Sequence, residues 1–258
     1  MTLVIGVVDT PDWGVVGDRP PAPEDIRQVC LSAAQCFESA IVERPVEPIC
    51  ITPTRDLTDP PHTLFNRLAT GQVAIKLSVR GCQWAQLVYQ FAHEFCHVLM
   101  NFRHPKVHPT MWIEESLCEM SSLFALRAMA SRWRVAPPYQ HWAAYADALD
   151  QYANDRLAAP EHGVPAGVNF TEWLAGKLPM LEADPVRRDD NTVIARHLLL
   201  LFEADPETWR ALRYLNLWST LEDVTLATHF NVWRLATPPQ YHAAVDRIER
   251  CLMGASPS

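Results

Sequence analysis

The chain has 258 residues, of which 48% are hydrophobic and 20% are charged, so it can form one large domain or two small ones. Its formal net charge of -8, with no cluster of Lys and Arg, argues against a nucleic-acid partner. The N-terminus lacks a positively charged leader, and no apolar run reaches the roughly 18 residues of a membrane span. We therefore expect a cytoplasmic protein with no membrane partner. Its seven cysteines, with no Cys-x-x-Cys pair, are expected to be reduced thiols.

The first part of the chain alternates predicted strands and helices. β-Branched residues predict a short strand at 3–9, and apolar residues at three-to-four spacing predict a helix at 24–41. A second strand is expected at 47–52. The clearest strand is 72–80, where apolar residues alternate with small or polar ones.

The segment 83–101 contains no Pro or Gly and has the apolar spacing of an amphipathic helix. It includes the motif His93-Glu94-Phe95-Cys96-His97. Residues four apart lie one turn above each other, so His93 and His97 can both reach one ion at about 2.0–2.1 Å, the distance that zinc prefers. Glu94 then lies beside the ion without binding it, and its carboxylate can accept a proton from a metal-bound water. The motif therefore predicts the helix of a zinc hydrolase.

A second helix-compatible segment, 111–120, follows a loop that contains proline. Together the two segments resemble the gluzincins, the thermolysin and aminopeptidase-N-like zinc peptidases, in which a second helix supplies a glutamate ligand about 18–25 residues beyond the motif. The aminopeptidase pattern Trp-Leu-x-Glu-Gly corresponds here to Trp112, Ile113, Glu114, Glu115 and Ser116. The resemblance implies that Glu115 is the third zinc ligand. It also implies that Glu119 accepts a hydrogen bond from the second nitrogen of His93.

The adjacent carboxylates of Glu114 and Glu115 lie about 100° apart around a helix, so both cannot point at the same ion. We assign the ligand position to Glu115 because Glu119, one turn later, lies on the same face. Glu114 is expected to contribute little to zinc binding.

The second part of the chain is predicted to be helical, with Pro or Gly between the helices. The segment 192–215 is similar to the helical region that follows the catalytic domain of aminopeptidase-N-like proteins. We expect an α+β fold, with a small sheet packed on the motif helix in a zincin-like catalytic domain at 1–134 and a helical domain at 135–258 that forms the other wall of a cleft. The helices are expected at 139–157, 170–181, 192–203, 206–218, 221–229 and 239–251.

Two features of the resembled enzymes bear on substrate binding and catalysis. An extended peptide pairs with the edge strand before their motif helix, which implies that role for 72–80, although an ordinary sheet strand is an equal alternative. These enzymes also carry a tyrosine that stabilises the oxyanion, and the corresponding positions here, 189–191, hold Asp-Asp-Asn. Replacements for that tyrosine could come from Tyr139, His197, Tyr214 or His229.

The sequence therefore predicts a zinc-dependent metallopeptidase that acts on a peptide or protein substrate, with Glu94 as general base and then general acid. One alternative is a binding or scaffold protein that retains the metal but does not turn over substrate. Another is a structural zinc whose fourth ligand is His104 or His108. The sequence does not determine the cleavage specificity or the oligomeric state.

Overall fold

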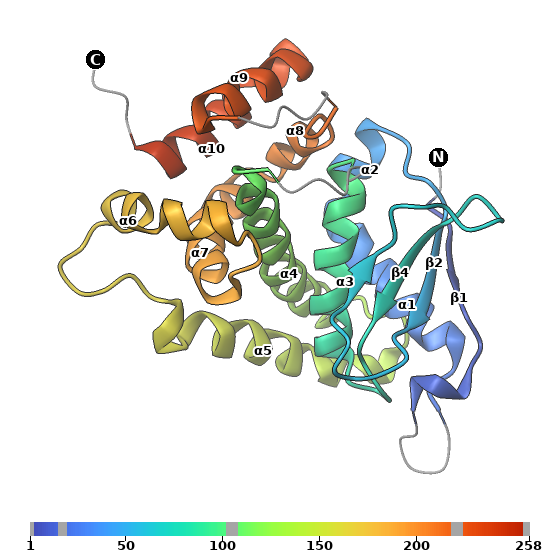
Figure 1. Cartoon of the computed structure of the whole chain (residues 1–258). Coiled ribbons are helices and arrows are strands. Elements are labelled where there is room, and N and C mark those ends of the chain that lie inside the picture. The colour runs from blue at the N-terminus through green and yellow to red at the C-terminus, as the bar shows by residue number, and fades with distance from the viewer. Residues whose placement is uncertain (1–2, 15–19, 102–107, 218–223, 255–258) are drawn as a thin grey trace.

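The computed structural model describes residues 3–14, 20–101, 108–217 and 224–254. A small mixed sheet lies at one side of the molecule and helices make up the rest (Figure 1). The fold is α+β, as the sequence predicts. No helix among these residues is both long and apolar enough to cross a membrane.

The sheet has four strands within the described residues, in the order β1-β2-β4-β3. Strands β1, β2 and β4 are parallel, and β3 is antiparallel to β4. The residues of β2 alternate between buried and half-buried, because one face of the sheet is covered by helices. The strands are β1 (Ile5–Val7), β2 (Ile49–Pro53), β3 (His62–Thr63) and β4 (Val73–Leu77).

The prediction that the strand at 72–80 lies at the edge of the sheet is wrong. Strand β4 pairs with β2 along its length, and Ile75 and Lys76 also face Thr63 and His62 of β3. Strand β3 is therefore the edge of the sheet on this side. A two-residue strand that follows two prolines has no periodic hydrophobic pattern, which explains why sequence reasoning missed it.

The helices of the first part are close to the predicted ranges. One difference is a 3-10 turn at Gln35–Phe37, which divides the expected helix at 24–41 into α1 and α2. The turn buries Phe37, whose ring packs edge-on against Trp209, with 4.6 Å between ring centroids. The helices are α1 (Pro23–Ala34), α2 (Glu38–Glu43), α3 (Trp84–Leu99) and α4 (Met111–Trp133).

The second part is helical, as expected, but two of its predicted helices differ. The helix expected at 206–218 is reduced to a 3-10 turn and a short helix, and the one expected at 221–229 begins in the described residues at Leu226. Residues 218–223 lie outside the described residues. The helices are α5 (Ala146–Ala158), α6 (Phe170–Ala183), α7 (Arg188–Ala204), α8 (Trp209–Leu212), α9 (Leu226–Ala236) and α10 (His242–Met253).

Helix α4 runs through the middle of the molecule, with α3 on one side, α7 on the other and α5 below (Figure 1). The contact between α3 and α4 is close because small serines face it. Ser121 and Ser122 donate hydrogen bonds to the backbone oxygens of Ala92 and Tyr89, at 2.9 and 2.8 Å. These bonds fix the rotation of α4 relative to the motif helix.

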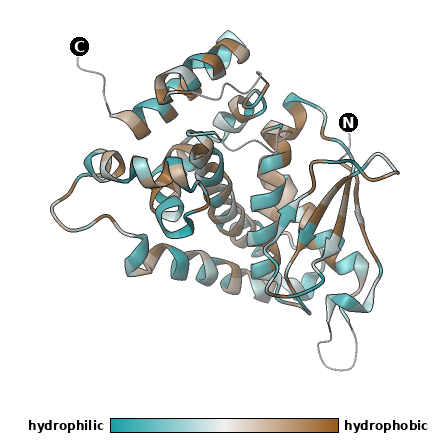
Figure 2. Ribbon diagram, viewed as in Figure 1, coloured by the Kyte–Doolittle hydropathy of each residue, from teal (hydrophilic) through white to brown (hydrophobic). Residues whose placement is uncertain are grey.

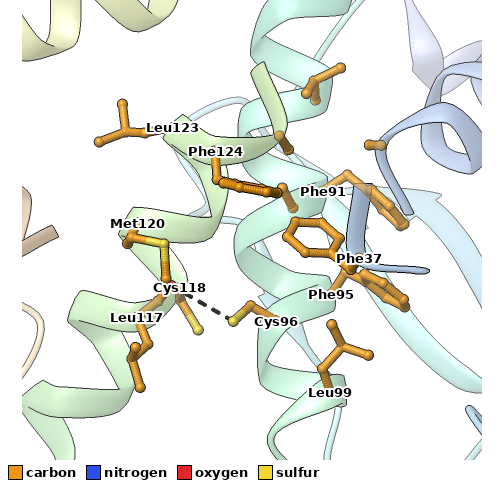
Figure 3. Close-up of a cluster of buried hydrophobic side chains, with 14 of the residues drawn as sticks. Phe37, Phe91, Phe95, Cys96, Leu99, Leu117, Cys118, Met120, Leu123 and Phe124 are labelled. Atoms are coloured by element: carbon orange, nitrogen blue, oxygen red, sulfur yellow. Dashed lines mark hydrogen bonds between the residues drawn. The ribbon is translucent and has the colours of Figure 1, made fainter. Parts of the chain in front are cut away.

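A single hydrophobic core continues across the predicted boundary between residues 134 and 135. Part of it, between α3 and α4, is built from phenylalanines, leucines and the facing cysteines Cys96 and Cys118 (Figure 3). The outlying helix α5 alternates between hydrophilic and hydrophobic residues along its length, as expected for a helix with one face in solvent (Figure 2). The boundary therefore separates two regions of sequence that share one core.

Candidate metal centre

The two motif histidines lie on the face of α3 that borders a cleft. Apolar residues such as Phe91 and Phe95 turn to the opposite side and are fully buried, which orients the helix. The imidazole rings of His93 and His97 are 5.2 Å apart between centroids. The structure thus brings the two rings together, as the spacing predicts.

Glu115 on α4 reaches both histidines. Its Oε2 lies 3.4 Å from Nε2 of His93, and its Oε1 lies 3.7 Å from Nε2 of His97. Two ligands of a tetrahedral zinc ion, each about 2.0–2.1 Å from the metal, are separated by about 3.3 Å. Each of the two contacts, one through each oxygen of Glu115, is close to that spacing, and a donor set of two imidazoles and a carboxylate fits zinc.

Cys118 is a second donor close to the histidines. One ligand atom from each of His93, His97 and Cys118 lies within 4.8 Å of the others, so these residues form a group that can hold a metal ion. By comparison, each carboxylate oxygen of Glu115 lies within 3.7 Å of one of the two histidines. Burial also raises the pKa of the Cys118 thiol well above its usual value, which opposes formation of the thiolate that metals bind. Cys118 belongs to the apolar cluster of Figure 3, and these surroundings favour Glu115 as the third ligand.

The carboxylate of Glu94 also lines the cleft, and a residue of the edge strand holds it in place. The hydroxyl of Thr63 lies 2.9 Å from Oε2 of Glu94 and 3.1 Å from its backbone oxygen. Both residues are buried. Strand β3 therefore contributes a residue to the site, which sequence analysis did not predict.

The Nδ1 atom of His97, the ring nitrogen that does not face Glu115, contacts Glu114. Nδ1 of His97 lies 2.8 Å from Oε1 of Glu114, and the side-chain amide of Asn216 donates to Oε2 of the same carboxylate at 2.7 Å. These contacts argue against the expectation that Glu114 contributes little, and zinc affinity of Glu114→Ala tests it. An acceptor on the second nitrogen of a ligating histidine fixes the ring and raises its basicity. Neither Glu114 in this role nor Asn216 was identified from the sequence.

The outer nitrogen of His93 faces Glu119, as the resemblance implies, but the separation is 4.0 Å and exceeds a hydrogen bond. The other oxygen of Glu119 accepts hydrogen bonds from three side chains. Tyr89 donates from α3, Arg156 from α5 at 3.2 Å, and Thr192 from α7 at 2.9 Å. Glu119 is thus held in a fixed orientation beside His93.

These carboxylates create an environment that favours positive charge between α3 and α4. Burial would lower the pKa of His97, but the charges of Glu115 and Glu114 outweigh burial and raise it to about 10. Burial likewise opposes ionisation of Glu115, yet the two imidazoles lower its pKa below the usual value. Such surroundings stabilise a cation, whether it is a proton or a metal ion.

The cleft beside these residues has a volume of about 740 Å³ and lies between the edge strand and the second part of the chain. The β3 segment contributes one side of its lining, and α5 and the start of α7 contribute another. The lining includes Phe65, Tyr152, Arg188, Asp189 and Asn191. Positions 189 and 191, at which the resembled enzymes have their tyrosine, therefore do lie at the cleft.

The four residues suggested as replacements for that tyrosine are not part of this lining. Each of them contacts another side chain: His197 stacks on Phe170, Tyr214 donates to Glu43, Tyr139 packs against Trp142, and His229 contacts Thr110. Sequence reasoning missed Tyr152 and Arg188, which line the cleft from α5 and α7.

The alternative of a structural zinc required a fourth ligand from His104 or His108. His104 lies outside the described residues. The Nδ1 atom of His108 lies 3.1 Å from the hydroxyl of Thr110, and His108 is not among the residues that line the cleft. His108 therefore gives this alternative no support.

Comparison with protein-family models, with curated proteins and with solved structures found no match. The resemblance to gluzincins consequently rests on the residues of this chain alone.

Proposed function

We propose that the protein is a zinc-dependent metallopeptidase. The observation that carries the proposal is that the Glu115 carboxylate lies within 3.4 Å of His93 and 3.7 Å of His97, with Glu94 beside them on a cleft of about 740 Å³. Two imidazoles and one carboxylate leave a coordination position for water, which is typical of catalytic zinc sites. When bound, zinc supplies a Lewis acid that polarises the substrate carbonyl and lowers the pKa of its water.

The chain's own residues account for proton transfer. Glu94 accepts a proton from the water while the water oxygen adds to the carbonyl carbon. Glu94 then passes that proton to the amine nitrogen as the C–N bond breaks. The contact with Thr63 orients the Glu94 carboxylate for both steps. Glu114 holds the ring plane of His97, and Glu119 places a carboxylate 4.0 Å from Nδ1 of His93.

Strand β3 supports the choice of a peptide as substrate. It pairs with β4 on one side, is the edge of the sheet, and contributes both of its residues to the cleft lining. An extended peptide can add to such an edge through backbone hydrogen bonds. We assign to β3 the substrate-binding role that sequence analysis gave to 72–80.

The test of this proposal compares Glu94→Gln with the wild type. We expect about one zinc per chain in both by elemental analysis, since the change removes a proton acceptor and no ligand. Cleavage of a broad peptide library, followed by mass spectrometry, should be lost in Glu94→Gln and kept in a control, Glu182→Gln, at an exposed position of α6. His93→Ala should lose the metal. Protein purified without chelators that holds no stoichiometric metal would contradict the proposal.

A second candidate is a binding or scaffold protein that retains the metal. The absence from the cleft lining of all four residues suggested as replacement oxyanion donors favours it. The orientation of Glu94 by Thr63 favours catalysis instead. If wild type and Glu94→Gln are equally inert toward the library while both bind one of its peptides, the scaffold candidate replaces the peptidase.

A further inference from the structure

Arg188 is the first residue of α7, and it lines the cleft with its side chain exposed. The proposed zinc ligands His93, His97 and Glu115 line the same cleft. A guanidinium here lies within the space in which a substrate would be held.

The other charged groups at this end of α7 are already paired. Asp190 forms ion pairs with Lys177 at 2.8 Å and with Arg187 at 2.7 Å. Asp189 lies 3.4 Å from Nε2 of His162. Arg156, the other arginine of the cleft, is paired with Glu119.

Arg188 differs from these groups because it has no ion pair with a carboxylate among the residues that the structure describes. It therefore keeps its five donors available for an anion in the cleft. A planar guanidinium binds a carboxylate through two parallel hydrogen bonds, and this match favours carboxylates over neutral amides.

The remainder of the lining indicates what else the substrate carries. Leu57, Phe65 and Val186 are exposed hydrophobic residues, and all three line this cleft. Apolar side chains of a ligand would cover them. The cleft thus combines an apolar surface with one cation that lacks a carboxylate partner among the described residues.

We propose that Arg188 binds a carboxylate of the peptide substrate, either the C-terminal carboxylate or that of an acidic side chain. This inference rests on the proposed peptidase function for the identity of the ligand as a peptide. Arg188 selects the substrate by charge, and the apolar residues of the cleft hold the neighbouring side chains.

The experiment measures binding, so it does not depend on turnover. The zinc-loaded, full-length Glu94→Gln protein is titrated with a fluorescent peptide of alanine, phenylalanine and leucine that ends in a free carboxylate, and with the same peptide as its C-terminal amide. A second pair of amidated peptides carries glutamate or glutamine in place of leucine. The difference within the first pair reports a C-terminal carboxylate, and the difference within the second reports a side-chain carboxylate.

We expect one of the two pairs to show about a 10–100-fold preference for the charged peptide, as charge-assisted hydrogen bonds provide. Adding Arg188→Gln should abolish that preference, and Arg188→Lys should keep part of it because lysine retains the charge but not the planar fork. Arg250→Gln, an equal charge change at an exposed position of α10 outside the cleft lining, should leave the preference intact. Thermal melts check that each variant is folded.

Three results would overturn the inference. Equal binding of charged and neutral peptides in the parent protein would show that no carboxylate is recognised. A preference that survives Arg188→Gln would mean that the metal, not Arg188, holds the carboxylate. Weaker binding of every peptide by the same factor would give Arg188 a general role. Failure of hydrolysis by the wild type with the preference intact would count against the peptidase proposal alone.

Discussion

Replacing Glu114 by alanine tests the main revision that the structure makes to the predicted site. The change removes the acceptor that lies 2.8 Å from Nδ1 of His97 and the oxygen that lies 2.7 Å from the amide of Asn216. It removes no ligand. From the sequence alone this variant was expected to bind zinc almost normally, whereas the structure predicts a clear loss.

The expected losses of zinc affinity and of unfolding free energy follow from these two contacts. Loss of an acceptor behind a ligating histidine typically weakens metal binding about 10–100-fold. A hydrogen bond to a charged group contributes about 1.5–3 kcal/mol, so the metal-free protein should also lose about 2–3 kcal/mol of unfolding free energy. Glu114→Gln should weaken zinc binding less than Glu114→Ala does, because the amide oxygen can still accept a hydrogen bond from His97.

Competition with a chromophoric zinc chelator measures the affinities, and urea unfolding of the metal-free proteins measures stability separately. We expect Glu115→Ala to be the most severe, with Glu114→Ala and Glu119→Ala both weakened about 10–100-fold. Glu182→Ala, at an exposed position of α6, is the matched control. If Glu114→Ala binds zinc within about 3-fold of wild type, the contact with His97 does not orient a ligand and the reasoning fails.

Local spacing explains the parts of the site that sequence analysis predicted. His93, Glu94 and His97 share one helix, so their relative positions follow from helix geometry alone. Glu115 and Glu119 likewise share a face of α4, and the structure brings both to the motif histidines. The helical character of the second part was also predicted, because Pro and Gly separate segments whose apolar residues have helical spacing.

The parts that sequence analysis missed depend on how distant elements meet. The role of Glu114 depends on the rotation of α4 against α3, which buried serine contacts determine. Its partner Asn216 is 102 residues away along the chain, and Thr192 is 73 residues from Glu119. No periodic pattern records such contacts. The region after residue 134 therefore contributes to the candidate metal centre, since it supplies groups that bind the carboxylates of Glu114 and Glu119.

Two further predictions concern groups outside the proposed ligand set. Cys118→Ser should change zinc affinity less than about tenfold, because we propose Glu115 as the third ligand; a loss as severe as that of Glu115→Ala would instead make the thiolate a ligand. The other prediction concerns acid stability. Burial is the main reason that the pKa of His229 falls from 6.5 to about 3. Folding therefore favours the neutral ring, so its contribution is complete above pH 6.5 and is lost as the pH falls towards 3. Between pH 7 and pH 5 the wild type should lose about 2 kcal/mol more unfolding free energy in urea titrations than His229→Gln does. His141→Gln, at an exposed position, should follow the wild type. Equal losses in wild type and His229→Gln would show that His229 does not resist protonation in the folded protein.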